Sequence, residues 1–324
     1  MTQLSLTRRD LARALTGGAI GAALPRRGAA KESAPDTYTY KKVGGLEIKL
    51  DVYGASPGAR RPAVIWIHGG ALIQGSRKRI SRRFQAKLRV LDYIVASIDY
   101  RLAPETKLPE IIADLRDACR WVREQGPQRC GIDAERIAVA GSSAGGYLTL
   151  MAGFTAAPRP RVLAAFYGYG DITTPWYSEP DDFYRKQPLV TREEAESSVG
   201  TAPVSEPPEQ SGRGRFYLYC RQQGLWPLKV AGHDPQKEPR WFDPYCPIRN
   251  VTAQYPPTIL IHGTADTDVP YSESQNMAAR LKAAGVEHEF ITVLGAGHGL
   301  SGATSEQTEN ADTRAAEFIR AHLA

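Results

Sequence analysis

Apolar and polar positions alternate with a period of two over residues 37–43 and 46–52, on either side of a Gly-Gly pair. This pattern is typical of a β-hairpin with a tight turn. Two continuous apolar runs follow at residues 63–67 and 94–98. Such runs indicate strands that are covered on both faces. This part of the chain therefore predicts a hairpin that joins a buried sheet.

Helical and strand patterns then alternate to the end of the chain. Apolar residues keep helical spacing over residues 108–125, and a second predicted helix over residues 272–284 stops at Gly285. The rest of the chain predicts strands at 137–140, 162–166, 258–261 and 289–294 and a closing helix at 305–323. Strands that alternate with helices are typical of a mostly parallel sheet with helices on both faces. The sequence therefore predicts an α/β, doubly wound fold.

The alternation is interrupted between about residues 170 and 254. This stretch is rich in proline and aromatic residues, and Thr191 with Glu194 predicts a capping box for one short helix. An insertion of this length between sheet strands is usually a lid or cap that carries function. We therefore expect a single domain over residues 31–324, with a cap insertion at about 170–254.

The first thirty residues have a different character from the rest of the chain. The pair Arg8-Arg9 precedes a weakly apolar stretch over residues 14–24, which is too short to span a membrane. This order resembles a twin-arginine export signal over residues 1–30, with a mature chain that starts near Lys31. A disordered basic tail is the alternative. Export predicts a periplasmic or secreted protein without a stable membrane anchor.

The leader also explains most of the net charge. The 324 residues carry a formal charge of +6, and residues 1–30 supply a surplus of four positive charges. No lysine- and arginine-rich run elsewhere alternates with aromatic residues that could stack on bases. We therefore expect no nucleic-acid partner, and the sequence does not indicate an oligomeric state.

Four cysteines are spread along the chain, at Cys119, Cys130, Cys220 and Cys246. None forms a Cys-x-x-Cys pair, so we expect no metal site. An exported protein permits disulfides. The first pairings to consider are Cys119 with Cys130 and Cys220 with Cys246, and buried free thiols are the alternative.

A Gly-x-Ser-x-Gly turn at residues 141–145 separates a predicted strand from a helix-compatible stretch at residues 147–152. Strand, tight turn and helix are the context of a nucleophile elbow, which exposes the hydroxyl of its central residue, Ser143. Ser142 is the competing candidate, but a nucleophile there would require glycine in place of Ala140. An ordinary loop of small residues is the alternative to both.

A base and an orienting acid follow in the order Ser, Asp, His that such a sheet requires. His298 comes directly after the last predicted strand, between two glycines that leave room for the imidazole. Asp266 lies in a loop after the strand at 258–261, and we favour it over Asp268 as the orienting carboxylate. The alternatives are a structural histidine and an aspartate that caps the next helix.

A glycine-containing loop also follows the strand at residues 63–67. The sequence His68-Gly69-Gly70-Ala71 lets the backbone approach a substrate carbonyl with its N–H groups free. Gly70 and Ala71, together with the N–H of Ala144, are the candidate oxyanion hole. A plain glycine turn is the alternative.

Five motifs together carry a resemblance to a known family. In chain order, they occupy residues 68–71, 99–105, 141–146, 262–270 and 297–299. With these motifs the chain resembles carboxylesterases of the α/β-hydrolase fold. It is similar to the hormone-sensitive-lipase-like group and to related bacterial feruloyl- or acetyl-esterase-like proteins.

The resemblance implies a triad of Ser143, Asp266 and His298, and an oxyanion hole of Gly70, Ala71 and Ala144. It further implies a serine carboxylesterase that acts on a small-molecule ester without a metal ion or organic cofactor. Two departures stand out: Ala71 replaces the usual third glycine, and Ser142 stands where the lipase-like group usually has aspartate. A prolyl-oligopeptidase-type peptidase and a non-catalytic binding protein are the alternative functions.

Overall fold

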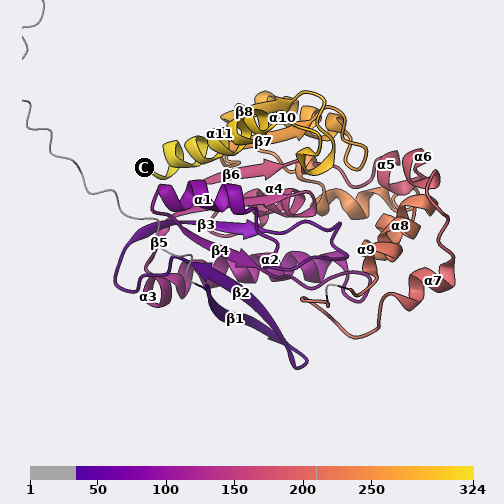
Figure 1. Cartoon of the computed structure of the whole chain (residues 1–324), viewed down its shortest axis with the longest axis horizontal. Helices are drawn as coiled ribbons and strands as arrows, with labels where there is room; N and C mark the ends of the chain where they lie inside the picture. The colour runs from indigo at the N-terminus through magenta and orange to yellow at the C-terminus, as the bar shows by residue number, and fades with distance from the viewer. Residues whose placement is uncertain (1–33, 209) are drawn as a thin grey trace, which may run out of the picture. The chain divides into compact units, whose positions relative to one another are not determined.

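The computed structural model describes residues 34–208 and 210–324 (Figure 1). The signal peptide expected over residues 1–30 lies outside the described residues. Within them, one sheet has the strand order β1-β2-β4-β3-β5-β6-β7-β8. The strand bounds are β1 (Asp36–Val43), β2 (Leu46–Tyr53), β3 (Arg61–Ile67), β4 (Ile94–Ile98), β5 (Ile132–Ser142), β6 (Val162–Phe166), β7 (Thr258–Gly263) and β8 (His288–Val293).

The sheet is mostly parallel, as predicted. β1 and β2 form the expected antiparallel hairpin, and β2 pairs antiparallel with β4. The remaining pairs are all parallel: β4 with β3, β3 with β5, β5 with β6, β6 with β7 and β7 with β8. In β3, Ala63, Ile65 and Ile67 pack into one hydrophobic cluster, whereas Val64 and Trp66 pack into the cluster on the other face. Burial on both faces explains why the central strands read as continuous apolar runs.

Helices cover both faces of this sheet. The first hydrophobic cluster includes α2 (Leu108–Glu124), α4 (Ala144–Thr155) and α10 (Tyr271–Ala283). The second includes α1 (Arg82–Val90) and α11 (Ser305–Leu323), which lie together in Figure 1. The helices predicted at 108–125, 272–284 and 305–323 are confirmed. The sequence pattern did not predict α1 or the short α3 (Gly126–Cys130).

The expected insertion lies between β6 and β7 and contains helices without any strand in its described residues. Its elements are α5 (Pro175–Ser178), α6 (Asp182–Arg185), α7 (Arg192–Ser197), α8 (Arg213–Gln223), α9 (Trp226–Ala231), η1 (Pro239–Tyr245) and η2 (Pro247–Arg249). The predicted capping box of Thr191 and Glu194 begins α7. Figure 1 places α5–α9 on the side toward which the arrows of β3 and β6 point. The insertion therefore lies near the carboxyl ends of the parallel strands, where ligands bind in open α/β sheets.

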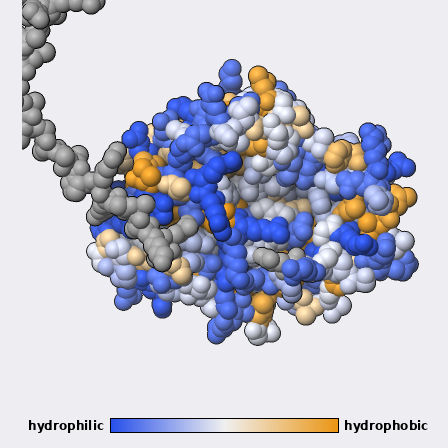
Figure 2. Space-filling model, in the orientation of Figure 1, coloured by the Kyte–Doolittle hydropathy of each residue, from blue (hydrophilic) through white to orange (hydrophobic). Residues whose placement is uncertain are grey.

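The surface is hydrophilic over most of the face shown in Figure 2, and hydrophobic colour gathers at the end occupied by the insertion. Among the described residues, the insertion supplies three exposed large hydrophobic side chains, Phe183, Leu189 and Leu228. No helix in the described ranges combines the length and apolarity that crossing a membrane would demand.

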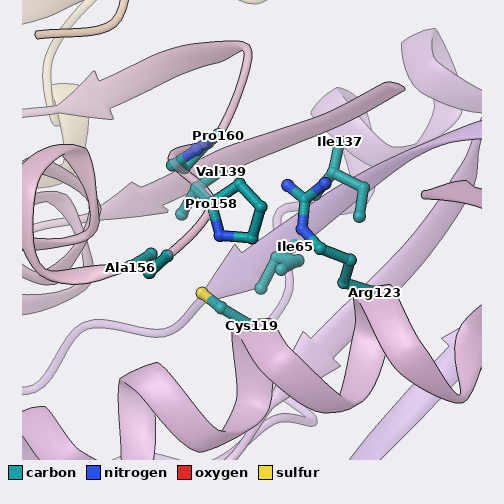
Figure 3. A pocket seen from close by; sticks show the side chains of 9 residues that line it. Ile65, Cys119, Arg123, Ile137, Val139, Ala156, Pro158 and Pro160 are labelled. Carbon is teal, nitrogen blue, oxygen red and sulfur yellow. The ribbon is translucent and has the colours of Figure 1, made fainter. Parts of the chain in front are cut away.

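All four cysteines are free thiols, so the candidate disulfides Cys119–Cys130 and Cys220–Cys246 are not formed. The Cys119 side chain instead lines a cavity of about 10 Å³, together with Arg123 of α2 and Pro158 (Figure 3). A cavity of this volume has room for about one water molecule. Burial raises the pKa of Cys119 and of Cys220 to about 12, so both thiols stay protonated at neutral pH.

Candidate active site

Ser143 occupies the sharp turn between β5 and α4. Its backbone is in a rarely populated conformation, with φ of 55° and ψ of −121°. The turn can be this tight because Gly145 has no side chain. A Cβ atom added there would lie 2.0 Å from the carbonyl oxygen of Ile67 in β3. The strand–turn–helix geometry is therefore that of a nucleophile elbow.

The imidazole of His298 joins Ser143 to Asp266. Its Nε2 lies 3.0 Å from Ser143 Oγ, and its Nδ1 lies 2.8 Å from Asp266 Oδ2. A proton on Nδ1 is donated to the carboxylate, so Nε2 is the acceptor for the serine hydroxyl. The side chain of His298 is 25% exposed, whereas that of Asp266 is fully buried. The three side chains therefore form one hydrogen-bonded chain that reaches toward solvent at its histidine.

The Asp266 carboxylate is held by backbone and side-chain donors. Its Oδ1 accepts hydrogen bonds of 2.9 Å from the N–H groups of Asp268 and Val269. Its Oδ2 also lies 3.2 Å from Nε2 of the buried His262. Burial alone would raise the pKa of Asp266, but its contacts with His262 and His298 and its backbone donors hold that pKa far below its ordinary value. Asp266 is therefore a permanent anion beside Nδ1.

The same surroundings act on His298 in opposite directions. Burial lowers the pKa of its imidazole. The hydrogen bond to Asp266, together with the negative charges of Asp268 and Asp266, outweighs that effect, although Arg221 opposes them. The net pKa of His298 is raised above its ordinary value of 6.5, so the protein favours the protonated imidazolium.

Asp268, the competing candidate for the orienting acid, lies at the other ring nitrogen. Its Oδ2 is 3.4 Å from His298 Nε2, on the side that faces Ser143. Two side chains of α8, Tyr217 and Arg221, bind its Oδ1. Neither α8 residue could be predicted from the sequence, because the insertion carries no motif that links them to the catalytic loops.

The candidate oxyanion loop follows β3 and has a strained backbone. Gly70 and Ala71 have φ angles of 114° and 56°. A Cβ at Gly70 would lie 2.0 Å from the carbonyl oxygen of Gln74, so only glycine fits there. Among the hydrogen bonds of the described residues, none uses the N–H groups of Gly70, Ala71 or Ala144. These three N–H groups remain available to a ligand.

Buried side chains fix this loop from two sides. His68 stacks on Tyr100 with ring centroids 4.3 Å apart, and its Nδ1–H donates a 2.7 Å hydrogen bond to the carbonyl oxygen of Gly69. Burial lowers the pKa of His68 to about 4, so it is neutral and structural at physiological pH. From the insertion, Trp226 Nε1 donates a 2.9 Å hydrogen bond to the carbonyl oxygen of Ala71. The insertion therefore contacts the oxyanion loop directly.

No group of three or more His, Cys, Asp or Glu side chains in residues 34–208 and 210–324 is arranged to hold a metal ion. The sequence pattern of a family described as having the alpha/beta hydrolase fold matches residues 64–301, which include every candidate site residue. The chain belongs to this α/β-hydrolase family. The family resemblance expected from the sequence motifs is thus confirmed.

Two known proteins are similar in sequence to this α/β-hydrolase. It is 29% identical over 343 residues to the non-reducing polyketide synthase ausA of Penicillium brasilianum, an alignment that covers 89% of this chain and 14% of the synthase. It is 28% identical over 270 residues to the esterase LipC of Mycobacterium tuberculosis, with coverage of 81% of this chain and 60% of LipC. The α/β-hydrolase therefore spans less than two thirds of either relative.

A solved structure agrees with the architecture of the α/β-hydrolase. An alpha/beta hydrolase superfamily protein from Enterococcus faecalis superposes with a TM-score of 0.69 at 22% identity. The superposition covers 89% of this chain and 98% of the Enterococcus protein. At this level of identity, the likeness shows the shared fold alone.

Proposed function

We propose that this chain is a serine carboxylesterase that cleaves a carboxylic ester through an acyl-enzyme. The observation that carries the proposal is the continuous hydrogen-bonded chain from Ser143 Oγ through His298 to Asp266. A serine on a strained elbow, a histidine acceptor and a buried carboxylate are the parts that nucleophilic acyl transfer requires. The 28% identity to a protein described as an esterase supports the same chemistry.

Acylation follows from the positions of these atoms. Ser143 Oγ attacks the ester carbonyl carbon while His298 Nε2 takes the hydroxyl proton. Asp266 stabilises the imidazolium that results, and its fixed backbone donors keep the imidazole in the correct orientation. The carbonyl oxygen becomes an oxyanion, for which the N–H groups of Gly70, Ala71 and Ala144 are the proposed donors. Collapse of the tetrahedral species breaks the bond to the alcohol oxygen, which takes the proton from Nε2.

Deacylation repeats the cycle with water. His298 Nε2 takes a proton from a water molecule, whose oxygen attacks the acyl carbon. The bond from that carbon to Ser143 Oγ then breaks, and Nε2 returns the proton to the serine. The products are the carboxylic acid and the free enzyme.

Covalent labelling by a fluorophosphonate probe tests the nucleophile. We expect the wild type to be labelled at Ser143, and Ser143→Ala to lose both labelling and turnover of p-nitrophenyl acetate. Ser142→Ala is the matched control, because its side chain precedes the elbow, and it should still be labelled. A wild type that stays unlabelled indicates a binding protein rather than an enzyme.

Substrate classes are separated by comparing p-nitrophenyl acetate and butyrate with an aminoacyl-p-nitroanilide. We expect the esters to be cleaved with the higher kcat/KM. Faster cleavage of the anilide would instead identify a peptidase that uses the same triad.

A further inference from the structure

Asp268 connects a helix of the insertion to the reactive face of His298. Tyr217 donates its hydroxyl hydrogen to Asp268 Oδ1, and an Arg221 amino group donates to the same oxygen over 2.7 Å. The same amino group also donates to the Asp268 carbonyl oxygen over 2.9 Å. Because both side-chain donors of α8 bind Oδ1, Oδ2 is turned toward His298 Nε2, at 3.4 Å.

Arg221 holds this carboxylate in a fixed position. The Arg221 side chain is 1% exposed, and its second amino group donates to Asp181 Oδ2 over 2.6 Å. Four aromatic rings surround its guanidinium carbon at distances between 4.6 and 5.9 Å, namely those of Trp176, Tyr177, Tyr184 and Tyr217. Two carboxylates face one guanidinium, so the group retains a net negative charge. Asp268 is therefore a rigid, negatively charged acceptor.

The cluster around Arg221 also contains polar atoms that lack a hydrogen-bond partner within the described chain. Trp176 Nε1 and Arg221 Nε are buried and have no hydrogen-bond partner among the described residues. A buried N–H that lacks a partner costs roughly 1–3 kcal/mol, and in folded proteins such groups are usually satisfied by water or a ligand.

The proposed reaction brings the substrate alcohol next to Asp268. In acylation, His298 Nε2 donates its proton to the leaving alcohol oxygen, which must approach Nε2 to hydrogen-bonding distance. Asp268 Oδ2 lies beside the same nitrogen, so the first carbons of the alcohol pass along the carboxylate. A purely alkyl alcohol would displace water from this charge without replacing its hydrogen bonds. A hydroxyl group on the neighbouring carbon would donate to it.

We propose that Asp268 binds the alcohol portion of the substrate and selects esters that carry a free hydroxyl on the carbon next to the esterified one. Esters of glycerol and of sugars both have this chemistry. The inference rests on the proposed esterase function and names its substrate class. Asp268 is thus a specificity residue that touches the substrate, with Arg221 and Tyr217 as its positioning residues.

The test compares kcat/KM for glycerol 1-monoacetate and a xylose monoacetate with kcat/KM for propyl acetate, which lacks the hydroxyl. We expect the wild type to prefer at least one of the hydroxylated esters, and the preferred one identifies the source of the alcohol. In Asp268→Asn, Arg221 and Tyr217 donate to the amide oxygen, so the amide N–H₂ faces the substrate. The group that meets the substrate hydroxyl is then a donor in place of an acceptor. The preference should fall about tenfold or more, as expected for a lost charge-assisted hydrogen bond.

The ratio of two substrates isolates this effect, because any change in His298 affects both esters alike. Asp114→Asn is the matched control: it neutralises another buried aspartate that an arginine binds, Arg101, but none of its hydrogen bonds or ion pairs in the described part of the chain reaches the triad, so it should keep the wild-type preference. Equal preference in the wild type and Asp268→Asn would overturn the proposal. So would a wild type that cleaves propyl acetate as efficiently as both hydroxylated esters, a result that needs no variant to fold. Absence of all ester cleavage and of fluorophosphonate labelling would instead reject the esterase function itself.

Discussion

The indole nitrogen of Trp226 donates a 2.9 Å hydrogen bond to the carbonyl oxygen of Ala71. Trp226 begins α9 in the insertion and is fully buried, whereas Ala71 lies in the loop after β3. Because Ala71 has a φ of 56°, its peptide groups need support from neighbouring atoms to keep their orientation. The insertion is therefore part of the structure that orients the candidate oxyanion donors, in addition to covering the strand ends.

Trp226→Phe should lower kcat while leaving KM nearly unchanged. Phenylalanine can keep the stack on Tyr177, whose ring lies 4.1 Å away, but it cannot donate to Ala71. A hydrogen bond contributes about 1 kcal/mol net. If losing it destabilises the transition state by that amount, kcat falls about fivefold. Steady-state kinetics with p-nitrophenyl acetate measures this change.

The matched control is Trp66→Phe. Trp66 is also buried and donates its indole N–H to a backbone carbonyl, that of Arg79, at 3.3 Å. This carbonyl does not belong to the candidate oxyanion loop, so we expect lower stability with an unchanged kcat. If both variants lose kcat equally, the Trp226 contact has no specific role in catalysis.

The pH dependence of kcat/KM should show an acidic limb with a midpoint above pH 6.5. The reaction requires neutral His298, and the contacts with Asp266 and Asp268 raise its pKa above that value despite burial. Below the midpoint, kcat/KM falls about tenfold for each pH unit, because the fraction of neutral imidazole falls by that factor. A profile between pH 5 and 9 with a non-ionising ester measures the midpoint.

Asp268→Asn provides the comparison for this profile. Removing one negative charge beside Nε2 should move the midpoint to lower pH, since the carboxylate stabilises the imidazolium. A midpoint that stays in place would show that Asp268 does not influence the titration of His298.

The sheet and its helices could be predicted because the burial of each element determines which of its positions are apolar. The continuous apolar runs of β3 and β4 follow directly from burial on both faces, whereas the residues of β1 are exposed or half-buried without a strict alternation. The insertion could not be predicted in the same way. Its short helices depend on tertiary contacts such as Trp226 with Ala71, which link residues far apart in the chain.

The sequence predicted which loops carry the candidate site residues, but it did not predict every contact between them. Motifs at the strand ends placed Ser143 and His298, and the structure brings their side chains within hydrogen-bonding distance. Asp266 and Asp268 were harder to distinguish, since both lie in one loop and are two residues apart. The backbone N–H groups that bind Asp266 turn its carboxylate to Nδ1 and leave Asp268 at Nε2. No sequence signal marked Arg221, because its role depends on where α8 packs.

Gly145→Ala should destabilise the protein by about 1–3 kcal/mol. The added Cβ would lie 2.0 Å from the carbonyl oxygen of Ile67, so α4 and β3 would have to move apart. Overpacking of this kind typically costs about 1–3 kcal/mol, and contact with backbone atoms allows little relief. Urea unfolding measures the free energy of unfolding, and the displaced elbow should also lose esterase activity.

Gly214→Ala is the matched control, since Gly214 is likewise the second residue of its helix, α8. A Cβ there meets only Gln74 Oε1, at 3.7 Å, which is an ordinary contact. Alanine should therefore stabilise α8 by about 0.5–1 kcal/mol. Equal destabilisation by both substitutions would contradict the close packing of the elbow.

Glu273→Gln should make stability less dependent on pH. Glu273 in α10 is 5% exposed, and its Oε2 accepts hydrogen bonds from the N–H groups of Gly170 and Asp171, where the insertion begins. Burial, aided by the charge of Asp171, raises the pKa of Glu273 from 4.5 to about 7. Between these values the folded protein retains a proton that the unfolded chain has released. The free energy of unfolding therefore falls as the pH rises through this window.

Glutamine keeps an oxygen acceptor for both backbone N–H groups and has no charge to bury. Relative to the wild type, Glu273→Gln should gain about 1–3 kcal/mol in free energy of unfolding between pH 5 and pH 8, as measured by urea denaturation at each pH. Glu124→Gln, at an exposed position at the end of α2, should show no such gain. A difference between Glu273→Gln and wild type that is the same at both pH values would mean that Glu273 is already ionised in the folded protein at pH 5.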